Sequence, residues 1–355
     1  MTEQKFGHVG FRVHRSRWLT AFLLAIVAGT AAAEKRGYQV YVTNEGSGDV
    51  SVIDGRSHSV QRTLNLGTRP RGIVASADGR RVFVALSGSP LASPGVDKSI
   101  LPAADKAADG IAVIATLTGK VLRVLQGVSD PEQLAINRDG SRLYVASEDT
   151  GKAIVIDPHA DSVLANVDVG AEPEGIAVNA GSTILSVTSE ADNTVAFIDL
   201  RRKCLVQRIP VGLRPRDVAF GNNDATLYVS GEASGTLTVI DVKTRKVLRS
   251  LRVPGDGARP KGIAMASDGT RVYVTTGSGG HVVAFDSKTL AVVGTVAVGA
   301  RPWGLALSPD NRYLYTANGP SNDVSVVDTR SMTLISTVKV GNRPWGVAIV
   351  ATTPN

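Results

Sequence analysis

Apolar and polar residues alternate along short runs of the chain, and each run is bounded by residues typical of turns. This period of two predicts half-buried β-strands, because successive side chains of a strand point to opposite faces. The stretch after Pro260 shows one complete unit of the pattern. Its expected parts are strands at 262–266, 271–276, 281–286 and 290–298, a hairpin turn at 267–269 and a loop at 277–280.

A proline bend introduces each such unit. In residues 298–308 it reads Val-Gly-Ala-Arg301-Pro302-Trp303-Gly304-Leu-Ala-Leu-Ser, which is the end of one strand, a tight bend and the start of the next. The prolines of its seven copies are Pro70, Pro131, Pro173, Pro215, Pro260, Pro302 and Pro344, and they lie 61, 42, 42, 45, 42 and 42 residues apart. A fixed period of this length indicates a repeat architecture. Antiparallel four-stranded units with no helix between them are typical of a β-propeller.

The two ends of the chain complete the repeat count. The first unit starts at what is elsewhere the second strand, at 38–44, and the last unit stops after a lone first strand at 346–350. Three N-terminal strands and one C-terminal strand would form one blade and close the ring, which removes the open sheet edges. We therefore predict an all-β fold, a seven-bladed β-propeller of four-stranded antiparallel blades.

Residues 1–33 differ from the rest of the chain. A basic segment with four Lys or Arg residues precedes an apolar run at 18–29 and a small-residue site at Ala31-Ala32-Ala33. This order is typical of a secretory signal peptide. An uncleaved anchor is the alternative, although the apolar run is short for a membrane span. We expect a periplasmic or secreted protein with one propeller domain at 34–355 and no membrane span after cleavage. Loss of the segment would lower the net charge from +7 to +4.

Cysteine and histidine are scarce, which limits the chemistry that the fold can carry. Cys204 is the only cysteine, so no intrachain disulfide can form and cysteine-rich metal sites are excluded. The three histidines after residue 33 are isolated from one another. We therefore predict no metal site, and we expect Cys204 to be a small core residue on a strand.

Several strands carry a shared motif that resembles a known family. Tyr41-Val-Thr-Asn44, Tyr273-Val-Thr-Thr276 and Tyr315-Thr-Ala-Asn318 are each followed by a strand of the kind seen at Val324-Ser-Val-Val-Asp328. These motifs resemble the YVTN-repeat β-propellers over essentially the whole chain after residue 33. The segment from Ala85 to Gly110 is similar to that of propellers associated with PQQ-dependent catabolism. The resemblance implies an exported protein that accompanies quinoprotein alcohol oxidation.

The charges beside the bend prolines are sorted along the ring. Strand parity places these bends and the loops between second and third strands on one rim of the central channel. Blades with Asp130/Glu132 and Glu172/Glu174 form an acidic sector, and the other five form a basic sector with two tryptophans. An anionic planar ligand would be held there by guanidinium hydrogen bonds and stacking. The predicted ligand-binding residues are Arg69, Arg71, Arg214, Arg216, Arg259, Lys261, Arg301, Trp303, Arg343 and Trp345.

The architectural alternative stays open for the same residues. Glu45, Glu148, Glu190 and Glu232 take corresponding positions in neighbouring loops, so they would neutralise part of the basic sector. Proline fixes φ and glycine lets the backbone turn, so the bend motif also has a purely structural use. No cofactor follows from the residues themselves, and the family resemblance implies PQQ as a possible bound ligand.

The interval of 61 residues contains an insertion at about 87–109 between the second and third strands of one blade. A loop of this length is commonly functional. We interpret it as a partner-docking loop with candidate residues Asp97, Lys98, Asp105, Lys106 and Asp109. The resemblance implies a periplasmic quinoprotein dehydrogenase or its electron-transfer partner as the protein that docks.

Three functions remain open from the sequence. The favoured one is a non-catalytic ligand- or protein-binding scaffold, because no catalytic constellation is present. A lactonase-like hydrolase is the alternative, and it would need a general base and an electrophilic group at the mouth, for which Glu172/Glu174 and Arg214/Arg216 are the available pairs. Nucleic-acid binding is the weakest of the three, because a net charge of +4 supplies little attraction for phosphates.

Overall fold

The computed structural model describes residues 7, 37–91 and 100–352. Residues 1–35 form one unit of the chain and residues 36–355 another. The predicted signal peptide and the candidate residues Asp97 and Lys98 lie outside the described residues. None of the described helices is both long and apolar enough to span a membrane.

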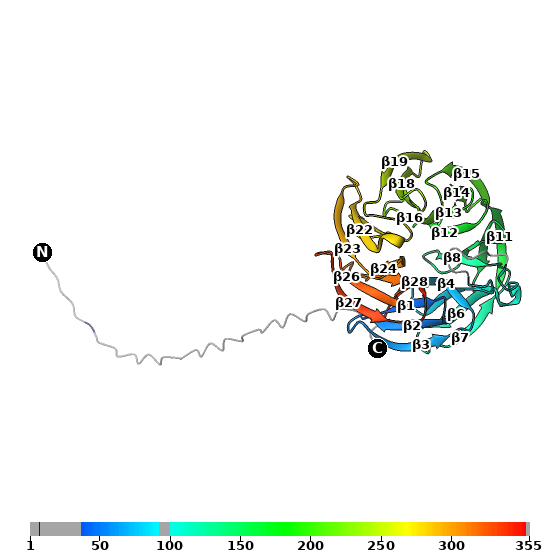
Figure 1. Ribbon diagram of the computed structural model, residues 1–355, viewed down its shortest axis with the longest axis horizontal. Coiled ribbons are helices and arrows are strands. Elements are labelled where there is room, and N and C mark those ends of the chain that lie inside the picture. Colours follow the sequence, from blue (N-terminus) through cyan, green and yellow to red (C-terminus); the bar gives the residue numbers. More distant parts are fainter. Residues whose placement is uncertain (1–6, 8–36, 92–99, 353–355) are drawn as a thin grey trace. The chain divides into compact units, whose positions relative to one another are not determined.

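Seven four-stranded antiparallel sheets follow one another around a central channel, and each sheet is one blade (Figure 1). Blade 1 holds β28 (Pro344–Ala351), β1 (Tyr38–Asn44), β2 (Asp49–Asp54) and β3 (Ser59–Asn65). Blade 2 holds β4 (Arg69–Ala75), β5 (Arg81–Ser87), β6 (Gly110–Ala115) and β7 (Val121–Leu125). Blade 3 holds β8 (Pro131–Ile136), β9 (Leu143–Ser147), β10 (Lys152–Asp157) and β11 (Ser162–Asp168).

The other four blades follow in chain order. Blade 4 holds β12 (Pro173–Val178), β13 (Ile184–Ser189), β14 (Thr194–Asp199) and β15 (Cys204–Pro210). Blade 5 holds β16 (Pro215–Phe220), β17 (Thr226–Gly231), β18 (Thr236–Asp241) and β19 (Lys246–Arg252). Blade 6 holds β20 (Ile263–Met265), β21 (Arg271–Thr275), β22 (His281–Asp286) and β23 (Val292–Ala297). Blade 7 holds β24 (Pro302–Leu307), β25 (Tyr313–Asn318), β26 (Asp323–Asp328) and β27 (Thr333–Lys339). Two short 3-10 turns, η2 (Lys106–Ala108) and η3 (Gly277–Gly279), lie in loops.

The predicted seven-bladed fold is confirmed, including its closure. β28 pairs with β1 in antiparallel register, with Val40 opposite Ile349 and Val42 opposite Val347. Blade 1 therefore joins three N-terminal strands to one C-terminal strand, as the two incomplete units indicated. This pairing ties the ends of the described chain together and closes the ring.

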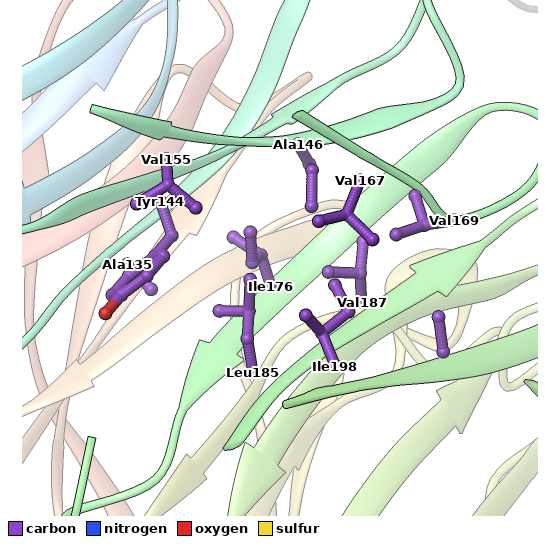
Figure 2. Close-up of a cluster of buried hydrophobic side chains, with 12 residues drawn as sticks. Ala135, Tyr144, Ala146, Val155, Val167, Val169, Ile176, Leu185, Val187 and Ile198 are labelled. Carbon is purple, nitrogen blue, oxygen red and sulfur yellow. The ribbon is translucent and has the colours of Figure 1, made fainter. Parts of the chain in front are cut away.

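The core lies between neighbouring blades. One cluster joins Tyr144 and Val155 of blade 3 to Ile176, Leu185 and Ile198 of blade 4, and Figure 2 shows these side chains meeting between the two sheets. The alternating apolar positions of the sequence are therefore buried against the next blade on both faces of the middle strands. The tyrosine of the recurring motif belongs to this packing; the fully buried side chains include Tyr41, Tyr228, Tyr273 and Tyr315.

Five of the seven bends have a glycine two residues after the proline, and this glycine has a packing reason. A Cβ on Gly72 would lie 2.3 Å from the carbonyl oxygen of Glu132 in the next blade, and one on Gly304 would lie 2.6 Å from that of Trp345. At Gly72 and Gly304 the inner strands approach one another too closely for a side chain. Where Asp217 replaces the glycine, its carboxylate accepts the backbone N–H of Ile263 at 2.8 Å, which links blade 5 to blade 6.

One expectation about the core was wrong. Cys204 does begin a strand, β15, but its side chain is exposed. The fourth strand of each blade forms the outer wall of the ring, so alternation along it buries fewer positions than in the middle strands. The single thiol therefore faces solvent.

Candidate functional site at the channel mouth

The bends and the loops between second and third strands meet at one end of the channel, as strand parity predicted. In blade 4 the backbone N–H of Glu190 donates to the carbonyl of Glu172 at 2.8 Å, and in blade 1 that of Glu45 donates to the carbonyl of Arg343 at 3.0 Å. They surround a cavity of about 1470 Å³, which we call the mouth. Its lining includes residues from the bends of all the blades and Pro90, Leu101 and Pro102 of the insertion.

Two layers of side chains line the mouth. The hinge residues precede the bend prolines at the top, and they are Arg69, Asp130, Glu172, Arg214, Arg259, Arg301 and Arg343. The floor residues follow the prolines deeper in the channel, and they are Arg71, Glu132, Glu174, Arg216, Lys261, Trp303 and Trp345. All floor residues except Trp303 are buried.

Five hinge residues adopt a left-handed backbone conformation. Their φ angles are 44° at Asp130, 51° at Glu172, 56° at Arg214, 49° at Arg301 and 54° at Arg343. This conformation costs a residue with a Cβ roughly 1–2 kcal/mol. Glycine would avoid that cost, yet every one of these positions carries a charge. Strain retained in this way is a common property of functional positions.

Arg71 is the cation at the centre of one floor network. Its guanidinium pairs with Glu132 and lies 3.5 Å from carboxylate oxygens of both Asp130 and Glu148, and 3.8 Å from Glu45. The carboxylates of Asp130, Glu132 and Glu148 lie within 4.8 Å of one another, a grouping that could bind a metal ion. The Arg71 guanidinium already supplies the positive charge among them.

Arg71 and Glu132, the closest pair of this network, both have shifted pKa values. Burial opposes the charge of Arg71, but the carboxylates of Glu132, Glu45 and Glu148 outweigh it and raise its pKa. Burial raises the pKa of Glu132 well above its usual range despite the Arg71 charge, and the nearby Glu174 and Glu148 carboxylates add to the effect. The floor therefore holds at least one carboxyl group that is hard to ionise.

Arg216 is the centre of a second network on the next blades. It pairs with Glu174, with Glu190 and, at 2.6 Å, with Glu232. Burial raises the pKa of Glu174 to about 8, against the charge of Arg216. Burial also opposes ionisation of Glu232, but Lys261 and Arg216 outweigh it and lower the pKa of Glu232 to about 2. The pKa values of Glu174 and Glu232, which lie beside the same guanidinium, are therefore shifted in opposite directions.

Lys261 connects the second network to the aromatic side of the floor. Its Nζ lies 3.0 Å from the Glu232 carboxylate and 3.7 Å from the ring centre of Trp303. Burial lowers the pKa of Lys261 to about 7, helped by the charge of Arg216 and opposed by Glu232. The cation holds one face of the indole, which fixes the ring at the floor.

Trp303 and Trp345 lie side by side, with ring centres 5.8 Å apart and planes tilted by 32°. Arg301 lies over Trp303 at 5.0 Å and Arg71 over Trp345 at 5.7 Å. Cations on indole faces are attracted by the negative charge of the ring face. The two tryptophans predicted from the repeat are thus neighbours within a ring of cations.

The predicted basic sector is for the most part neutralised. Arg69 pairs with Glu45 at 2.5 Å, Arg214 with Glu190 at 2.5 Å and Arg259 with Glu232 at 3.2 Å. Arg71, Arg216 and Lys261 are paired on the floor, as described above. Within residues 37–91 and 100–352, neither Arg301 nor Arg343 has a carboxylate oxygen within 4.0 Å.

Arg301 shows what this lack of a partner means. The side chain is only partly exposed, and burial lowers its pKa, as do the positive charges of Arg216, Arg259 and Arg343. The carboxylate of Glu232 opposes this effect without forming an ion pair. Of the ten predicted ligand-binding residues, Arg301 and Arg343 thus have no carboxylate partner among the described residues, and each comes two residues before a floor tryptophan, Trp303 or Trp345.

A family model of YNCE-like beta-propellers matches residues 74–355. The chain belongs to this family. The match supports the resemblance to repeat propellers drawn from the motifs, and it does not separate the subfamily associated with PQQ. No curated protein matches this YNCE-like propeller.

Solved structures similar to this YNCE-like propeller have diverse descriptions. A functionally unknown protein from Desulfotomaculum acetoxidans has a TM-score of 0.73 at 16% identity, over 89% of this chain and 99% of that one. A candidate 6-phosphogluconolactonase from Bacteroides uniformis has a TM-score of 0.71 at 16% identity, over 89% and 100% of the chains. The hydrazine synthase of Kuenenia stuttgartiensis has a TM-score of 0.66 at 19% identity, over 81% and 96%. At these identities the likeness shows the fold alone.

The described parts of the insertion are anchored to the mouth of this YNCE-like propeller. Asp109, 2% exposed, accepts the backbone N–H groups of Gly88 at 2.7 Å and Asp130 at 2.9 Å. Asp105 caps η2 by accepting from Ala107 at 3.1 Å. Lys106 pairs with Asp149 at 2.5 Å across the rim. Of the candidate docking residues, Asp105 and Lys106 are therefore at the surface, whereas Asp109 is part of the anchor.

Sequence reasoning missed the depth of the charge networks. It placed Glu45, Glu148, Glu190 and Glu232 beside the bends, and it assigned Glu132 and Glu174 to an acidic sector of the rim without predicting their burial. Glu132 is fully buried and Glu174 is 5% exposed. The signal that could have found this is their position after the proline, where the side chain of an inner strand must point into the channel.

Proposed function

We propose that the mouth binds a small organic anion with a planar apolar part, between the guanidinium groups of Arg301 and Arg343, which have no carboxylate partner in the described part of the chain, and the indoles of Trp303 and Trp345. The observation that carries the proposal is Arg301. Its partly buried charge has cationic neighbours and no paired carboxylate, which is costly unless an anion completes the site.

The chemistry of the four side chains supports recognition rather than catalysis. A guanidinium presents two parallel N–H donors to a carboxylate or phosphate, and such charge-assisted bonds contribute about 1.5–3 kcal/mol each. The adjacent indoles offer a flat apolar surface next to those donors. The cavity of about 1470 Å³ leaves room for a ligand of ordinary small-molecule size.

PQQ is a member of this ligand class, since it is planar and carries carboxylates. The resemblance of the segment from Ala85 to Gly110 to PQQ-associated propellers supports its choice as the first ligand to test. In this proposal the protein is an exported scaffold, periplasmic or secreted, that accompanies quinoprotein alcohol oxidation. The exposed residues Asp105 and Lys106 beside the mouth would contact the dehydrogenase or its electron-transfer partner.

The test is a titration of the full chain with PQQ, followed by tryptophan fluorescence. We expect saturable quenching, and a dissociation constant raised at least about tenfold in Arg301→Gln and Arg343→Gln, since each loses a charge-assisted contact. Trp303→Phe and Trp345→Phe identify the indoles that report binding. Trp18 lies in the predicted signal peptide, so it adds a constant background in a chain that retains this segment and none after cleavage.

Arg69→Gln is the matched control, because Arg69 is a hinge arginine that is already paired with Glu45. It should leave the PQQ titration nearly unchanged. Equal losses in Arg69→Gln and Arg343→Gln would show general electrostatic attraction and would contradict a defined site. Absence of quenching at high PQQ concentration would reject PQQ as the ligand.

A lactonase-like hydrolase is the second candidate, and Glu174 is the observation that favours it. This carboxyl lines the mouth beside Arg216, and its pKa is raised to about 8. A carboxyl with a raised pKa suits general acid–base catalysis, and a guanidinium beside it suits stabilisation of an oxyanion. The test is hydrolysis of a panel of sugar lactones by the parent chain and by Glu174→Gln. Turnover that Glu174→Gln abolishes, while the fold stays intact by circular dichroism, would favour the enzyme over the scaffold.

A further inference from the structure

We propose that the mouth selects zwitterionic ligands of extended shape, because Glu172, a carboxylate with no ion-pair partner among the described residues, lies across the ring of blades from Arg301 and Arg343. This inference rests on the proposed anion site and adds the second charge of the ligand. It predicts a carboxylate at one end of the ligand, held over the indoles, and an ammonium group at the other end.

The seven hinge residues differ in whether they have an ion-pair partner. Four of the seven are already paired: Arg69 with Glu45, Asp130 with Arg71, Arg214 with Glu190, and Arg259 with Glu232. In the described chain the other three, Glu172, Arg301 and Arg343, have no ion pair and no side-chain hydrogen bond. Among the seven hinge residues, the unpaired charges are thus one carboxylate and two guanidinium groups, counted within the described chain.

The order of the blades places Glu172 across the ring from Arg301 and Arg343. Inner strands contact one another in the order β4, β8, β12, β16, β20, β24, β28 and back to β4, which is a closed ring. Glu172 precedes β12, Arg301 precedes β24 and Arg343 precedes β28. From β12, three steps in one direction reach β24 and three steps in the other reach β28. In a ring of seven, no other pair of blades is farther from blade 4, and Figure 1 shows these inner strands on opposite sides of the centre.

The three unpaired hinge residues share one backbone conformation. Glu172, Arg301 and Arg343 share a left-handed φ of 51°, 49° and 54°, so the backbone bends in nearly the same way at all three positions. All three line the mouth. The carboxylate and the two guanidinium groups therefore border the same cavity from opposite walls.

The floor between the two walls does not compete for a ligand's charges. Arg71 and Arg216, which lie there, are each surrounded by carboxylates. A ligand that crosses the mouth thus meets an anion-binding wall, a compensated floor and a cation-binding wall. A short peptide with free termini and an aromatic C-terminal side chain has this order of groups, with its aromatic ring on Trp303 and Trp345.

The experiment compares two peptides that differ in one charge. Gly-Gly-Phe and N-acetyl-Gly-Gly-Phe are titrated by calorimetry into the full chain and into Glu172→Gln. In the parent chain, acetylation should weaken binding about fivefold to tenfold, the value of one partly screened ion pair. In Glu172→Gln the two peptides should bind equally, at the affinity of the acetylated peptide for the parent.

Asp168→Asn is the matched control, since Asp168 is an acidic residue of the mouth on the neighbouring blade, is 78% exposed and already pairs with Lys152. It should keep the preference for the free N-terminus. Equal binding of both peptides to the parent chain, or an unchanged preference in Glu172→Gln, would overturn the role of Glu172.

The PQQ titration tests the anion site separately from the zwitterion proposal that rests on it. Saturable PQQ binding that depends on Arg343, together with no binding of Gly-Gly-Phe, would overturn the zwitterion proposal and leave the anion site standing. Failure of both PQQ and Gly-Gly-Phe to bind would count against both proposals. Loss of both peptides in Arg343→Gln, with the fold intact, would support the shared site.

Discussion

The two halves of the mouth treat charge in opposite ways. In blades 2 to 6 the guanidinium and ammonium groups of Arg71, Arg216 and Lys261 are buried among carboxylates that neutralise them. In blades 7 and 1 the same positions hold Trp303 and Trp345, and the arginines above them have no carboxylate partner among the described residues. One repeated motif thus carries a buried ion network in blades 2 to 6, and guanidinium groups without a carboxylate partner among the described residues in blades 7 and 1.

The largest difference between the halves should appear when each loses one guanidinium. Arg216→Met leaves Glu174, Glu190 and Glu232 without their shared cation in the interior, so we expect a loss of about 3–5 kcal/mol in the free energy of unfolding. Arg301→Met removes a charge that pairs with no carboxylate of the described residues, so its cost should be no more than about 1 kcal/mol, the size of its contact with Trp303. Urea denaturation measures both. Similar losses in the two variants would show that the halves are not distinct.

The glycine two residues after a bend proline tests whether both halves share one backbone constraint. Gly304→Ala places a Cβ 2.6 Å from the carbonyl of Trp345, and the resulting overlap should cost about 1–3 kcal/mol. Gln133→Ala is the matched control, because the corresponding position of blade 3 already carries a side chain. Thermal denaturation should show a lower midpoint for Gly304→Ala and a much smaller change for the control.

The paired half should also give the protein a characteristic pH dependence. Because the pKa of Glu174 is raised from 4.5 to about 8, the folded state holds more protons than the unfolded state between these values. The contribution of Glu174 to stability is therefore present below about pH 4.5 and is lost as the pH rises through about 8. Glu174→Gln cannot ionise, so its stability relative to the parent should increase over this range. The increase should be up to about 1.4 kcal/mol for each pH unit over which the carboxyl stays protonated in the folded chain and ionised in the unfolded one.

A substitution in the open half should leave that pH profile unchanged. Trp303→Phe is a suitable comparison, since it alters the floor without altering any carboxyl. A constant difference between Glu174→Gln and the parent from pH 5 to pH 8 would contradict the raised pKa. Measurement relative to the parent is needed because Asp217, whose pKa burial raises to about 7, titrates in the same window.

The smallest expected effect concerns the strained hinge backbone. Arg343→Gly relieves a φ of 54° and loses no ion pair, so it should stabilise the fold by about 0.5 kcal/mol. Arg214→Gly relieves a nearly equal φ of 56° but breaks the pair with Glu190, so its gain should be smaller or absent. Urea denaturation of the two variants side by side gives the comparison. A destabilised Arg343→Gly would show that this arginine supports the structure.

Much of the fold could be predicted from the sequence because propeller blades interact mainly with their neighbours. The strand over 38–44 and the lone strand near 346–350 indicated the closure that β1 and β28 form. The insertion was expected between about 87 and 109, and β5 ends at Ser87 while β6 begins at Gly110. The burial of Cys204 was wrong because strand alternation does not tell an outer strand from a middle one.

The sequence by itself determined the repeat, the seven blades, the rim on which the bends gather and the adjacency of Trp303 and Trp345. These follow from period and strand parity, which are properties of neighbouring residues and blades. Only the tertiary structure decided which charges are free. Arg69 and Arg343 occupy the same place in their repeats, yet Arg69 meets Glu45 and Arg343 meets no carboxylate among the described residues. Pairing depends on side chains that converge from several blades at one cavity, and such distances are fixed by the closed ring rather than by any single repeat.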